Sequence, residues 1–507
     1  MIAPPMSSTS RLVSRLGGGR QLVVDAVLLL AGLGVALLLV RHYLNPHDEG
    51  LVLQAAARMG DGDVPYRDFW WNYGPGQPLL LALLDRLPKT EPLMTWRLVR
   101  AAEDAFVAWA AYRLVLRETT QPWALGAWAA TVVLMVVVRL PNPNATCAAL
   151  VLLSLLLATR WPVAAGIAAG IVTLFRPELG LVALACLLIA AAPAARARAA
   201  LAWLAASVVT LLPFAILAGP WAIVDSTFGF DLTVQPDQRL AFPLVYDLDF
   251  EAGTFLHFYL PALLMAGLAL ALLGLAVIRP LPRIVALAPL GLAGAAYLVG
   301  RADVYHLVPI VAAVPAMLAV VAAKTVRAGR ARTALGVACA AVLVLFTVDG
   351  VLRRIDFVSD APAVAGINIK QARWIQTFPG DVKETEQLRV LLDQRYPPRA
   401  PIFLANARHD DVRAGVTLMY VLMDRPNPTR YDVMQPGVVT RADVQREIVD
   451  DLRRTRAPVV RWMDPSGAAR EKGSRRAGGG ATILDQELAT QYDVVATTGP
   501  YQLLERR

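Results

Sequence analysis

The sequence predicts an all-α polytopic membrane bundle of about eleven transmembrane helices, followed by a small C-terminal α/β domain outside the membrane. Of its 507 residues, 56% are hydrophobic and 18% are charged, which leaves too little polar surface to cover a soluble globule of this size. Apolar runs near the ~20 residues that cross a hydrocarbon core recur as far as residue 352. From residue 353 the chain is rich in Pro, Asp and Arg and has no run of that length.

The predicted division is a transmembrane domain over 1-352 and an extracytoplasmic α/β domain over 353-507. The first apolar run is too long for the core of a signal peptide and has no small-residue cleavage site, so we expect an uncleaved helix. The expected spans are 21-41, 93-116, 122-139, 145-159, 162-175, 178-192, 200-218, 258-278, 284-299, 305-323 and 333-352.

Basic residues alternate with the spans. Lys and Arg gather in every second short loop, for example at Arg196, Arg198 and Lys324, and the positive-inside rule places those loops in the cytoplasm. The N-terminus is then cytoplasmic, and an odd number of spans puts the C-terminal domain on the outer side of the inner membrane. The net charge of +9 therefore reflects topology, and no nucleic-acid partner is expected. The three cysteines lie in apolar runs, so neither a disulfide framework nor a zinc site is expected.

The C-terminal domain should contain short strands and at least one amphipathic helix. Gly-, Ser- and Arg-rich residues 465-480 cannot bury apolar area, which predicts a mobile loop. A helix should start at a Thr440 cap and run to about Thr455. The expected strands are Pro401 to Leu404 and Pro458 to Trp462, with a terminal hairpin of Asp493 to Thr497 and Tyr501 to Leu504.

The first outer loop has the densest polar motifs. Asp48 and Glu49 directly follow the first span, where two carboxylates are costly to desolvate unless they contact a ligand or face water. Interfacial helices are expected over 51-58 and 78-87. The alternative interpretation is that both acids only mark a hydrated loop.

Two later outer segments interrupt apolar runs. Arg176-Pro177-Glu178 breaks the chain between two spans, and the planar guanidinium fork of Arg176 would suit a phosphate. The alternative is an internal pair between Arg176 and Glu178. Arg301, Asp303 and His306 join two further spans. His306 would bind phosphate or acceptor, or else serve as a structural donor, and Arg301 and Asp303 could pair with each other.

This arrangement resembles the GT-C class of polytopic membrane glycosyltransferases, which includes the protein O-mannosyltransferases and the aminoarabinose and lipopolysaccharide-core sugar transferases. The resemblance rests on Asp48-Glu49-Gly50, on Pro65-Tyr66-Arg67-Asp68-Phe69, and on Tyr73-Gly74-Pro75 ahead of the apolar run 79-84. It implies a polyprenyl-phosphate-linked sugar as donor and transfer to a hydroxyl of a glycan, lipid or protein acceptor on the outer face.

On that resemblance Asp48 is the expected general base, since an inverting transferase needs only one such carboxylate. Glu49 would orient the acceptor, or hold a divalent cation (Mg or Mn) together with Asp48. The residues expected to bind donor phosphate are Arg176, Arg67, His306 and Arg301, and those expected to bind substrate are Tyr66, Asp68, Tyr73, Glu178 and Asp303.

Two other functions fit the composition: a transporter or flippase of lipid-linked sugars, and a non-catalytic envelope scaffold. Transporters usually have ionisable residues near the bilayer midplane and broken helices. Here the charges gather at helix ends on one side, which favours an interfacial enzyme. A scaffold would tolerate substitution of Asp48.

Overall fold

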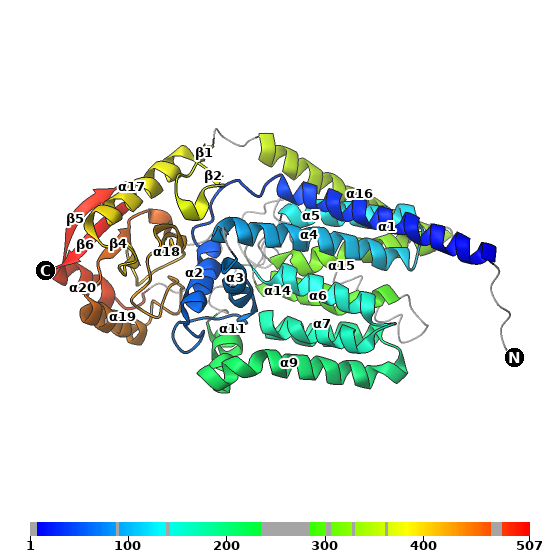
Figure 1. The fold of residues 1–507 in the computed structure, drawn as a ribbon, viewed down its shortest axis with the longest axis horizontal. Helices are drawn as coiled ribbons and strands as arrows, with labels where there is room; N and C mark the ends of the chain where they lie inside the picture. The colour runs from blue at the N-terminus through cyan, green and yellow to red at the C-terminus, as the bar shows by residue number, and fades with distance from the viewer. Residues whose placement is uncertain are drawn as a thin grey trace.

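The computed structural model describes residues 8–87, 91–137, 142–234, 283–300, 306–326, 330–359, 364–467 and 479–507. A bundle of roughly parallel and antiparallel helices lies beside a smaller C-terminal part, called the tail from here on, which comprises the described residues from 364 onward (Figure 1). The N-terminal end of α1 and the tail lie at opposite ends of the bundle. The described bundle helices are α1 (Ser8–Leu37), α4 (Pro92–Leu116), α5 (Gln121–Val137), α6 (Asn144–Leu157), α7 (Pro162–Phe175), α8 (Pro177–Ala190), α9 (Arg196–Ala218), α14 (Ala288–Gly300), α15 (Val308–Thr325) and α16 (Arg330–Ser359).

The bundle has the apolar helices of a membrane protein. Four described segments are long and apolar enough to cross a membrane: Gly19–Leu37, Pro193–Ala218, Val308–Thr325 and Arg332–Ile355. Four shorter apolar helices pack among them. Leucines such as Leu22, Leu201 and Leu345 are more than 60% exposed on α1, α9 and α16, which is the expected state of a lipid-facing surface.

Helices lie at most of the positions where spans were predicted. Each predicted span that falls on described residues coincides with a helix, and 258-278 lies outside them.

Small residues allow helices α7 and α9 to pack closely against each other. A Cβ at Gly166 or Gly170 of α7 would approach a carbonyl oxygen of α9 to 2.3 and 2.5 Å, the kind of backbone approach that glycine permits between membrane helices.

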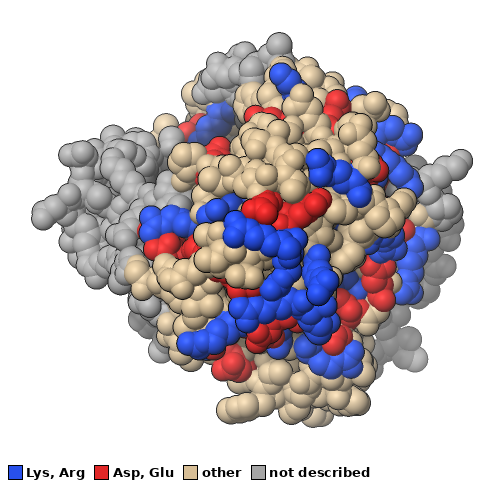
Figure 2. Space-filling model, turned by 90° about the vertical axis from the view of Figure 1, so that its left-hand side faces the viewer, with Lys and Arg blue, Asp and Glu red and all other residues tan. Residues whose placement is uncertain are grey.

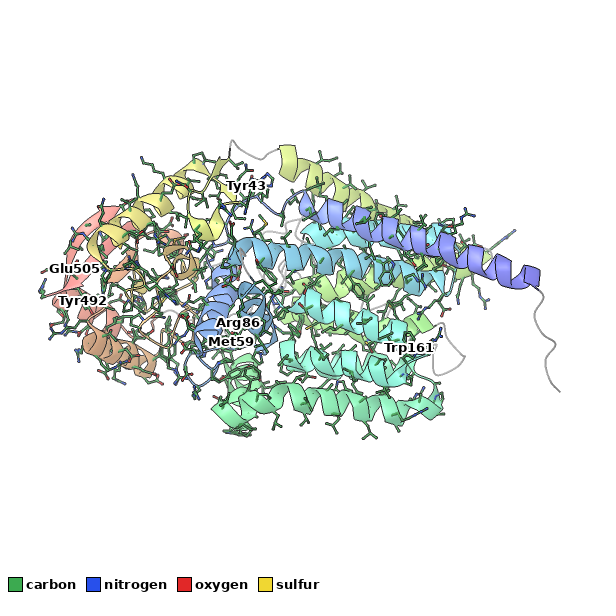
Figure 3. The ribbon with its side chains drawn as sticks, in the orientation of Figure 1. Tyr43, Met59, Arg86, Trp161, Tyr492 and Glu505 are labelled. Atoms are coloured by element: carbon green, nitrogen blue, oxygen red, sulfur yellow. The ribbon has the colours of Figure 1, made fainter. Side chains whose placement is uncertain are left out.

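The end of the bundle away from the tail is basic. Lys324 at the end of α15 pairs with Glu118 after α4 at 2.9 Å, and Arg117 donates to the carbonyl oxygen of Leu156 at 2.9 Å. Trp161, between α6 and α7, lies at this same end (Figure 3). The charge asymmetry used to predict topology is therefore an asymmetry of the folded bundle.

Two short helices lie at the opposite end, between the bundle and the tail. They are α2 (Asp48–Asp61) and α3 (Gly76–Asp85), close to the interfacial helices predicted at 51-58 and 78-87. Gly50 of α2 lies against the tail, because a Cβ there would come within 2.1 Å of the Leu418 nitrogen. The Pro46 carbonyl oxygen accepts from that same nitrogen at 2.8 Å. The segment from α9 continues on this side through α10 (Pro220–Val224), a π-helical turn (Asp225–Gly229) and α11 (Phe230–Thr233).

The tail is an α/β unit built on a four-stranded sheet. Its strand order is β3-β4-β6-β5, with β3 parallel to β4 and the other pairs antiparallel. The predicted strand Pro458 to Trp462 and the terminal hairpin are confirmed, and the strand predicted at Pro401 to Leu404 lies two residues later. The elements are β1 (Ala365–Gly366), β2 (Gln376–Thr377), α17 (Pro379–Arg395), β3 (Phe403–Asn406), α18 (Leu418–Met423), α19 (Ala442–Thr455), β4 (Val459–Trp462), α20 (Ile483–Gln491), β5 (Tyr492–Thr498) and β6 (Tyr501–Arg506).

Two features of the tail differ from the prediction, and a third falls on residues that the structure does not describe. The cap of α19 is Arg441 without a side-chain bond, and Thr440 instead accepts from the Gly437 nitrogen, so the predicted Thr440 cap is wrong. Helices α17 and α20 were not predicted. Most of the loop expected to be mobile, residues 468–478, lies outside the described residues.

The tail surface farthest from the bundle is hydrophilic. Figure 2 shows Lys and Arg intermixed with Asp and Glu over that face. The side chains are paired, as in Arg453–Glu487 at 2.6 Å and Arg507–Asp493 at 3.0 Å. Mixed, paired charges of this kind are typical of a face in contact with water.

Candidate functional site

Several bundle helices are too short to cross a bilayer. Helices α6, α7 and α8 have 14 residues each, roughly 21 Å at 1.5 Å per residue, against a hydrocarbon core of ~30 Å. Arg160 and Arg196 follow or precede these helices at the end of the bundle away from the tail, where charged residues reach the membrane surface. The opposite ends of the three helices should therefore stop inside the hydrocarbon core. Backbone breaks at membrane depth are tolerated where protein or a hydrated site surrounds them.

Arg176 occupies one of these breaks. Its backbone is extended (φ −145°, ψ 101°) between α7 and α8, as expected for a residue before proline. The Arg176 Nε donates to Glu178 Oε1 at 2.5 Å, and Arg176 Nη2 contacts the Tyr297 hydroxyl at 3.3 Å. The same hydroxyl donates to Glu178 Oε1 at 2.7 Å. The internal Arg176–Glu178 pair left open by the sequence is therefore present.

Aromatic rings enclose this guanidinium. The Arg176 Cζ lies 5.1 Å from the ring centre of Tyr73 and 5.2 Å from that of Tyr297, distances at which a cation and an aromatic face attract. The His306 ring packs edge-on against Tyr297 at 5.9 Å. The fold thus brings together four predicted residues, Tyr73, Arg176, Glu178 and His306. Tyr297 was missed, although a polar aromatic at the end of an apolar run is a usable signal.

Tyr73 is held in place by its neighbours in the first outer loop. A Cβ at Gly74 would lie 2.2 Å from the Leu174 carbonyl oxygen, so only glycine allows the loop to lie against the end of α7. Tyr66, in a left-handed conformation (φ 70°), donates its hydroxyl to the Tyr73 carbonyl oxygen at 2.6 Å. Burial raises the pKa of Tyr66 above its ordinary value, which keeps that hydroxyl a donor.

The two adjacent carboxylates have different surroundings. Glu49 is 4% exposed and both of its oxygens accept from Arg97 of α4, at 2.7 and 2.8 Å. Asp48 is half-buried and exchanges hydrogen bonds with Asn45, at 2.9 and 3.0 Å. Of the two acids, only Asp48 lacks an ion-pair partner among the described residues.

These surroundings suit a metal ion poorly. A divalent cation would need oxygen ligands from both acids, and both Glu49 oxygens are bound by Arg97. In the described part of the chain, no group of three His, Cys, Asp or Glu side chains is arranged to hold a metal.

Other predicted residues lie apart from the Arg176 cluster. Arg67 is 48% exposed and forms a bidentate pair with Asp68, at 2.9 and 2.7 Å. The hydrogen bonds from Arg67 lower the pKa of Asp68. No contact between described residues joins Asp48 to Arg176 or His306, and Arg301 and Asp303 lie outside the described residues.

Glu103 is a further polar residue near the cluster. It lies on α4 and accepts a hydrogen bond from Thr146 at the start of α6. Its other oxygen, Oε2, is buried and has no hydrogen-bond partner in the described part of the chain, and the same holds for Oδ1 of Asn144. Helix α6, which begins with Asn144 and carries Thr146, packs against both α7 and α8, so Glu103 lies beside the helix pair that holds Arg176. Glu103 was not predicted as a site residue, although a carboxylate inside an expected membrane span is a sequence signal that could have identified it.

Comparisons with solved structures match this architecture. ArnT from Cupriavidus metallidurans, in its apo crystal structure, aligns over 96% of this chain and 98% of its own with a TM-score of 0.55 and 14% identity. The chain has the GT-C fold. AglB from Archaeoglobus fulgidus, solved with an inhibitory peptide and a dolichol-phosphate, aligns over 95% of this chain and 74% of its own, with a TM-score of 0.48 and 12% identity. No protein-family model and no curated protein sequence matches. The GT-C fold predicted from the first outer loop and the spans is confirmed.

Proposed function

We propose that this GT-C-fold chain is a membrane glycosyltransferase that moves a sugar from a polyprenyl-phosphate donor to an acceptor hydroxyl. The observation that carries the proposal is the Arg176 cluster at the ends of short helices, on the side of the bundle next to the tail. Glu178 already offsets the charge of Arg176, and we assign the lipid phosphate as a second anion at the same guanidinium, which has donors on both of its edges. A lipid phosphate would reach this depth from the surrounding bilayer.

The cluster supports phosphate binding through orientation. Glu178 and Tyr297 fix the plane of the Arg176 guanidinium, and the Tyr73 and Tyr297 rings cover it. A preorganised planar fork binds phosphate oxygens with two parallel hydrogen bonds. His306 lies against Tyr297 and is proposed as a second phosphate contact.

Asp48 is the proposed base. Glu49 is neutralised by Arg97, whereas the half-buried carboxylate of Asp48 is bonded, among the described residues, to a neutral amide alone. Such a carboxylate remains able to take the proton of an acceptor hydroxyl as that oxygen attacks the sugar. The leaving lipid phosphate needs no general acid, so one carboxylate suffices. Glu49 is then assigned to holding α2 against α4 beneath Asp48.

The proposed sidedness follows from charge. The basic end of the bundle, with Arg117, Arg196 and Lys324, is assigned to the cytoplasm. The N-terminus is then cytoplasmic, the tail is extracytoplasmic, and the acceptor is a glycan, lipid or protein of the cell envelope.

Binding and transfer should respond to different substitutions. Full-length protein in nanodiscs would be titrated with undecaprenyl phosphate, which carries no sugar. Arg176→Ala should raise its dissociation constant roughly tenfold to hundredfold, the loss typical of a charge-assisted contact. Asp48→Asn should leave that constant unchanged and abolish sugar transfer in membranes. Unchanged binding by Arg176→Ala, or near-normal transfer by Asp48→Asn, would contradict the proposal.

A further inference from the structure

A groove of about 520 Å³ runs between the bundle and the tail, apart from the Arg176 cluster. One wall comes from the second half of α2, the end of α3 and Pro92, the first residue of α4. The other wall comes from the tail, around Lys370, Arg399 and the end of α18. Its charged lining residues are Arg58, Arg86, Lys370, Arg399, Arg425, Asp61, Asp85 and Asp424.

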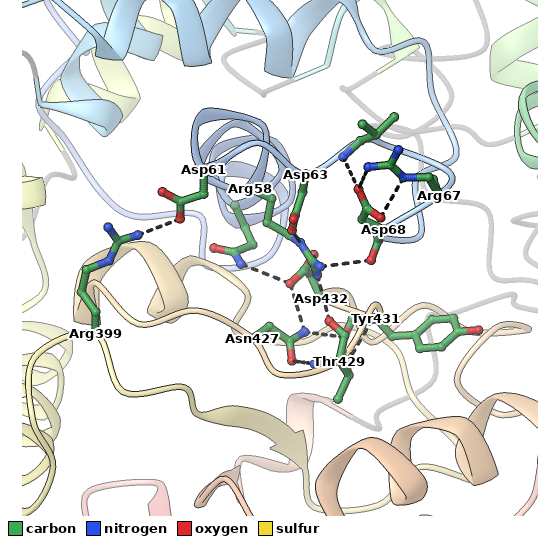
Figure 4. A network of polar contacts seen from close by, with 12 residues as sticks. Arg58, Asp61, Asp63, Arg67, Asp68, Arg399, Asn427, Thr429, Tyr431 and Asp432 are labelled. Atoms are coloured by element: carbon green, nitrogen blue, oxygen red, sulfur yellow. Dashed lines mark hydrogen bonds and ion pairs between the residues drawn. The ribbon is translucent and has the colours of Figure 1, made fainter. Parts of the chain in front are cut away.

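Most of these charges are already neutralised. Arg399 pairs with Asp61 at 2.7 Å (Figure 4) and approaches Asp424 at 4.0 Å. Arg58 pairs with Asp63 and Asp432, and Arg425 pairs with Asp393. Asp85 also takes part in a polar or electrostatic interaction.

Two cations in the groove are different. Neither Arg86 nor Lys370 has an ion-pair partner among the described residues, and both are exposed. Arg86 lies at the end of α3, in the same region as Met59 of α2 (Figure 3), while Lys370 belongs to the tail. Each wall therefore contributes one exposed cation that has no ion-pair partner among the described residues.

The groove opens at the edge of an apolar surface. Leu87 lines it and is 55% exposed, and Leu83, one turn earlier on α3, is 51% exposed. On the tail side Trp374 is 48% exposed, close in sequence to Lys370. Arg373 pairs with Glu91 at 2.7 Å and so fixes this segment beside the first residue of α4. Exposed Trp next to the end of a membrane helix is typical of the bilayer interface.

We propose that this groove binds the phosphate headgroup of an anionic phospholipid, whose acyl chains lie along the exposed leucines of α3. Two unpaired cations beside apolar surface match an amphiphile that has an anionic head. Because one cation comes from each wall, the bound lipid also fastens the tail to the bundle. This inference does not depend on the proposed sugar transfer.

The test uses the full chain in nanodiscs of phosphatidylcholine with phosphatidylglycerol as the titrated probe. Lipid retained by the protein is counted by native mass spectrometry. The variant is Arg86→Ala/Lys370→Ala, and the control is Lys383→Ala/Arg446→Ala, which removes two exposed tail cations from outside the groove. About fivefold per cation near a membrane surface predicts a tenfold to thirtyfold weaker retention for the groove variant. The control should retain phosphatidylglycerol like the unmodified protein.

Three results would overturn the proposal: equal loss in both variants, equal retention of phosphatidylcholine, or complete competition by millimolar inorganic phosphate. Recovery of a co-purified glycolipid in place of phospholipid would make the groove an acceptor site instead. Undecaprenyl phosphate binding is measured in parallel. Because the groove cations lie outside the Arg176 cluster, that binding should stay unchanged in both variants, which separates failure here from failure of the proposed transferase.

Discussion

The two adjacent carboxylates of the first outer loop should respond to substitution in opposite ways. Glu49 is buried and accepts two charge-assisted hydrogen bonds from Arg97, plus a third bond from the Asn45 nitrogen at 3.0 Å. Removing one partner of a buried ion pair costs about 3–5 kcal/mol, because the other charge stays desolvated. Glu49→Gln keeps the size and one acceptor oxygen, so we expect a loss of ~2–3 kcal/mol.

Asp48→Asn should cost far less. The Asp48 carboxylate is half-buried and bonded to a neutral amide, and Asn retains an oxygen that can accept that bond, so we expect under about 0.5 kcal/mol. The free energy of unfolding would be measured by SDS titration followed by tryptophan fluorescence. Arg97→Met should match the loss in Glu49→Gln, and the double substitution should cost less than the sum of the two, since the pair acts as one unit. Stable Glu49→Gln protein that loses transfer as completely as Asp48→Asn would refute this division of roles.

Three further predictions concern charge and topology. Glu103→Gln should lower transfer but not undecaprenyl phosphate binding, because its buried Oε2 has no donor among the described residues and is assigned to a hydroxyl of the donor sugar, which the sugar-free lipid lacks. Weaker binding of the sugar-free lipid would place Glu103 with the phosphate instead. Arg58→Met should speed proteolytic release of the tail, because the buried Asp432 carboxylate of the tail loses its ion-pair partner on α2 (Figure 4). An unchanged digestion rate would mean that other contacts hold the tail to α2. A cysteine introduced at Asp493 should react with an impermeant thiol reagent in intact cells, and one introduced at Arg198 should not. The three native cysteines are buried and should not react. The reverse labelling pattern would contradict the proposed topology.

The helices were predictable because their cause is local. Apolar runs of membrane length define most of the bundle, and short, largely apolar runs such as Val459–Trp462 define strands of the tail. Arg176 was also predictable, since an arginine followed by proline between apolar runs breaks a helix and needs an anion.

The partners of these residues were not predictable, because they come from distant segments. Arg97, Glu103 and Tyr297 all lie inside expected spans, where the sequence gives no indication of which face of the helix meets Glu49, Thr146 or Arg176. The separate roles of Asp48 and Glu49 likewise depend on Arg97, 48 residues further along the chain.

The contact of Gly74 with α7 provides a test of the Arg176 cluster that leaves every polar group in place. A Cβ at Gly74 would lie 2.2 Å from the Leu174 carbonyl oxygen and 2.6 Å from that of Phe175. Backbone atoms cannot yield as a flexible side chain can, so Gly74→Ala must push the loop, and Tyr73 with it, away from Arg176.

We expect Gly74→Ala to weaken undecaprenyl phosphate binding severalfold, because a cation–aromatic contact of this buried kind contributes about 1–2 kcal/mol. Gly60→Ala is the matched control, since a Cβ there meets no atom within 4 Å. Tyr73→Phe should bind nearly as well as the unmodified protein, because the aromatic ring that lies over Arg176 is kept. If Gly74→Ala is destabilised yet binds the lipid normally, Tyr73 only packs against α7, and the phosphate site must be sought elsewhere.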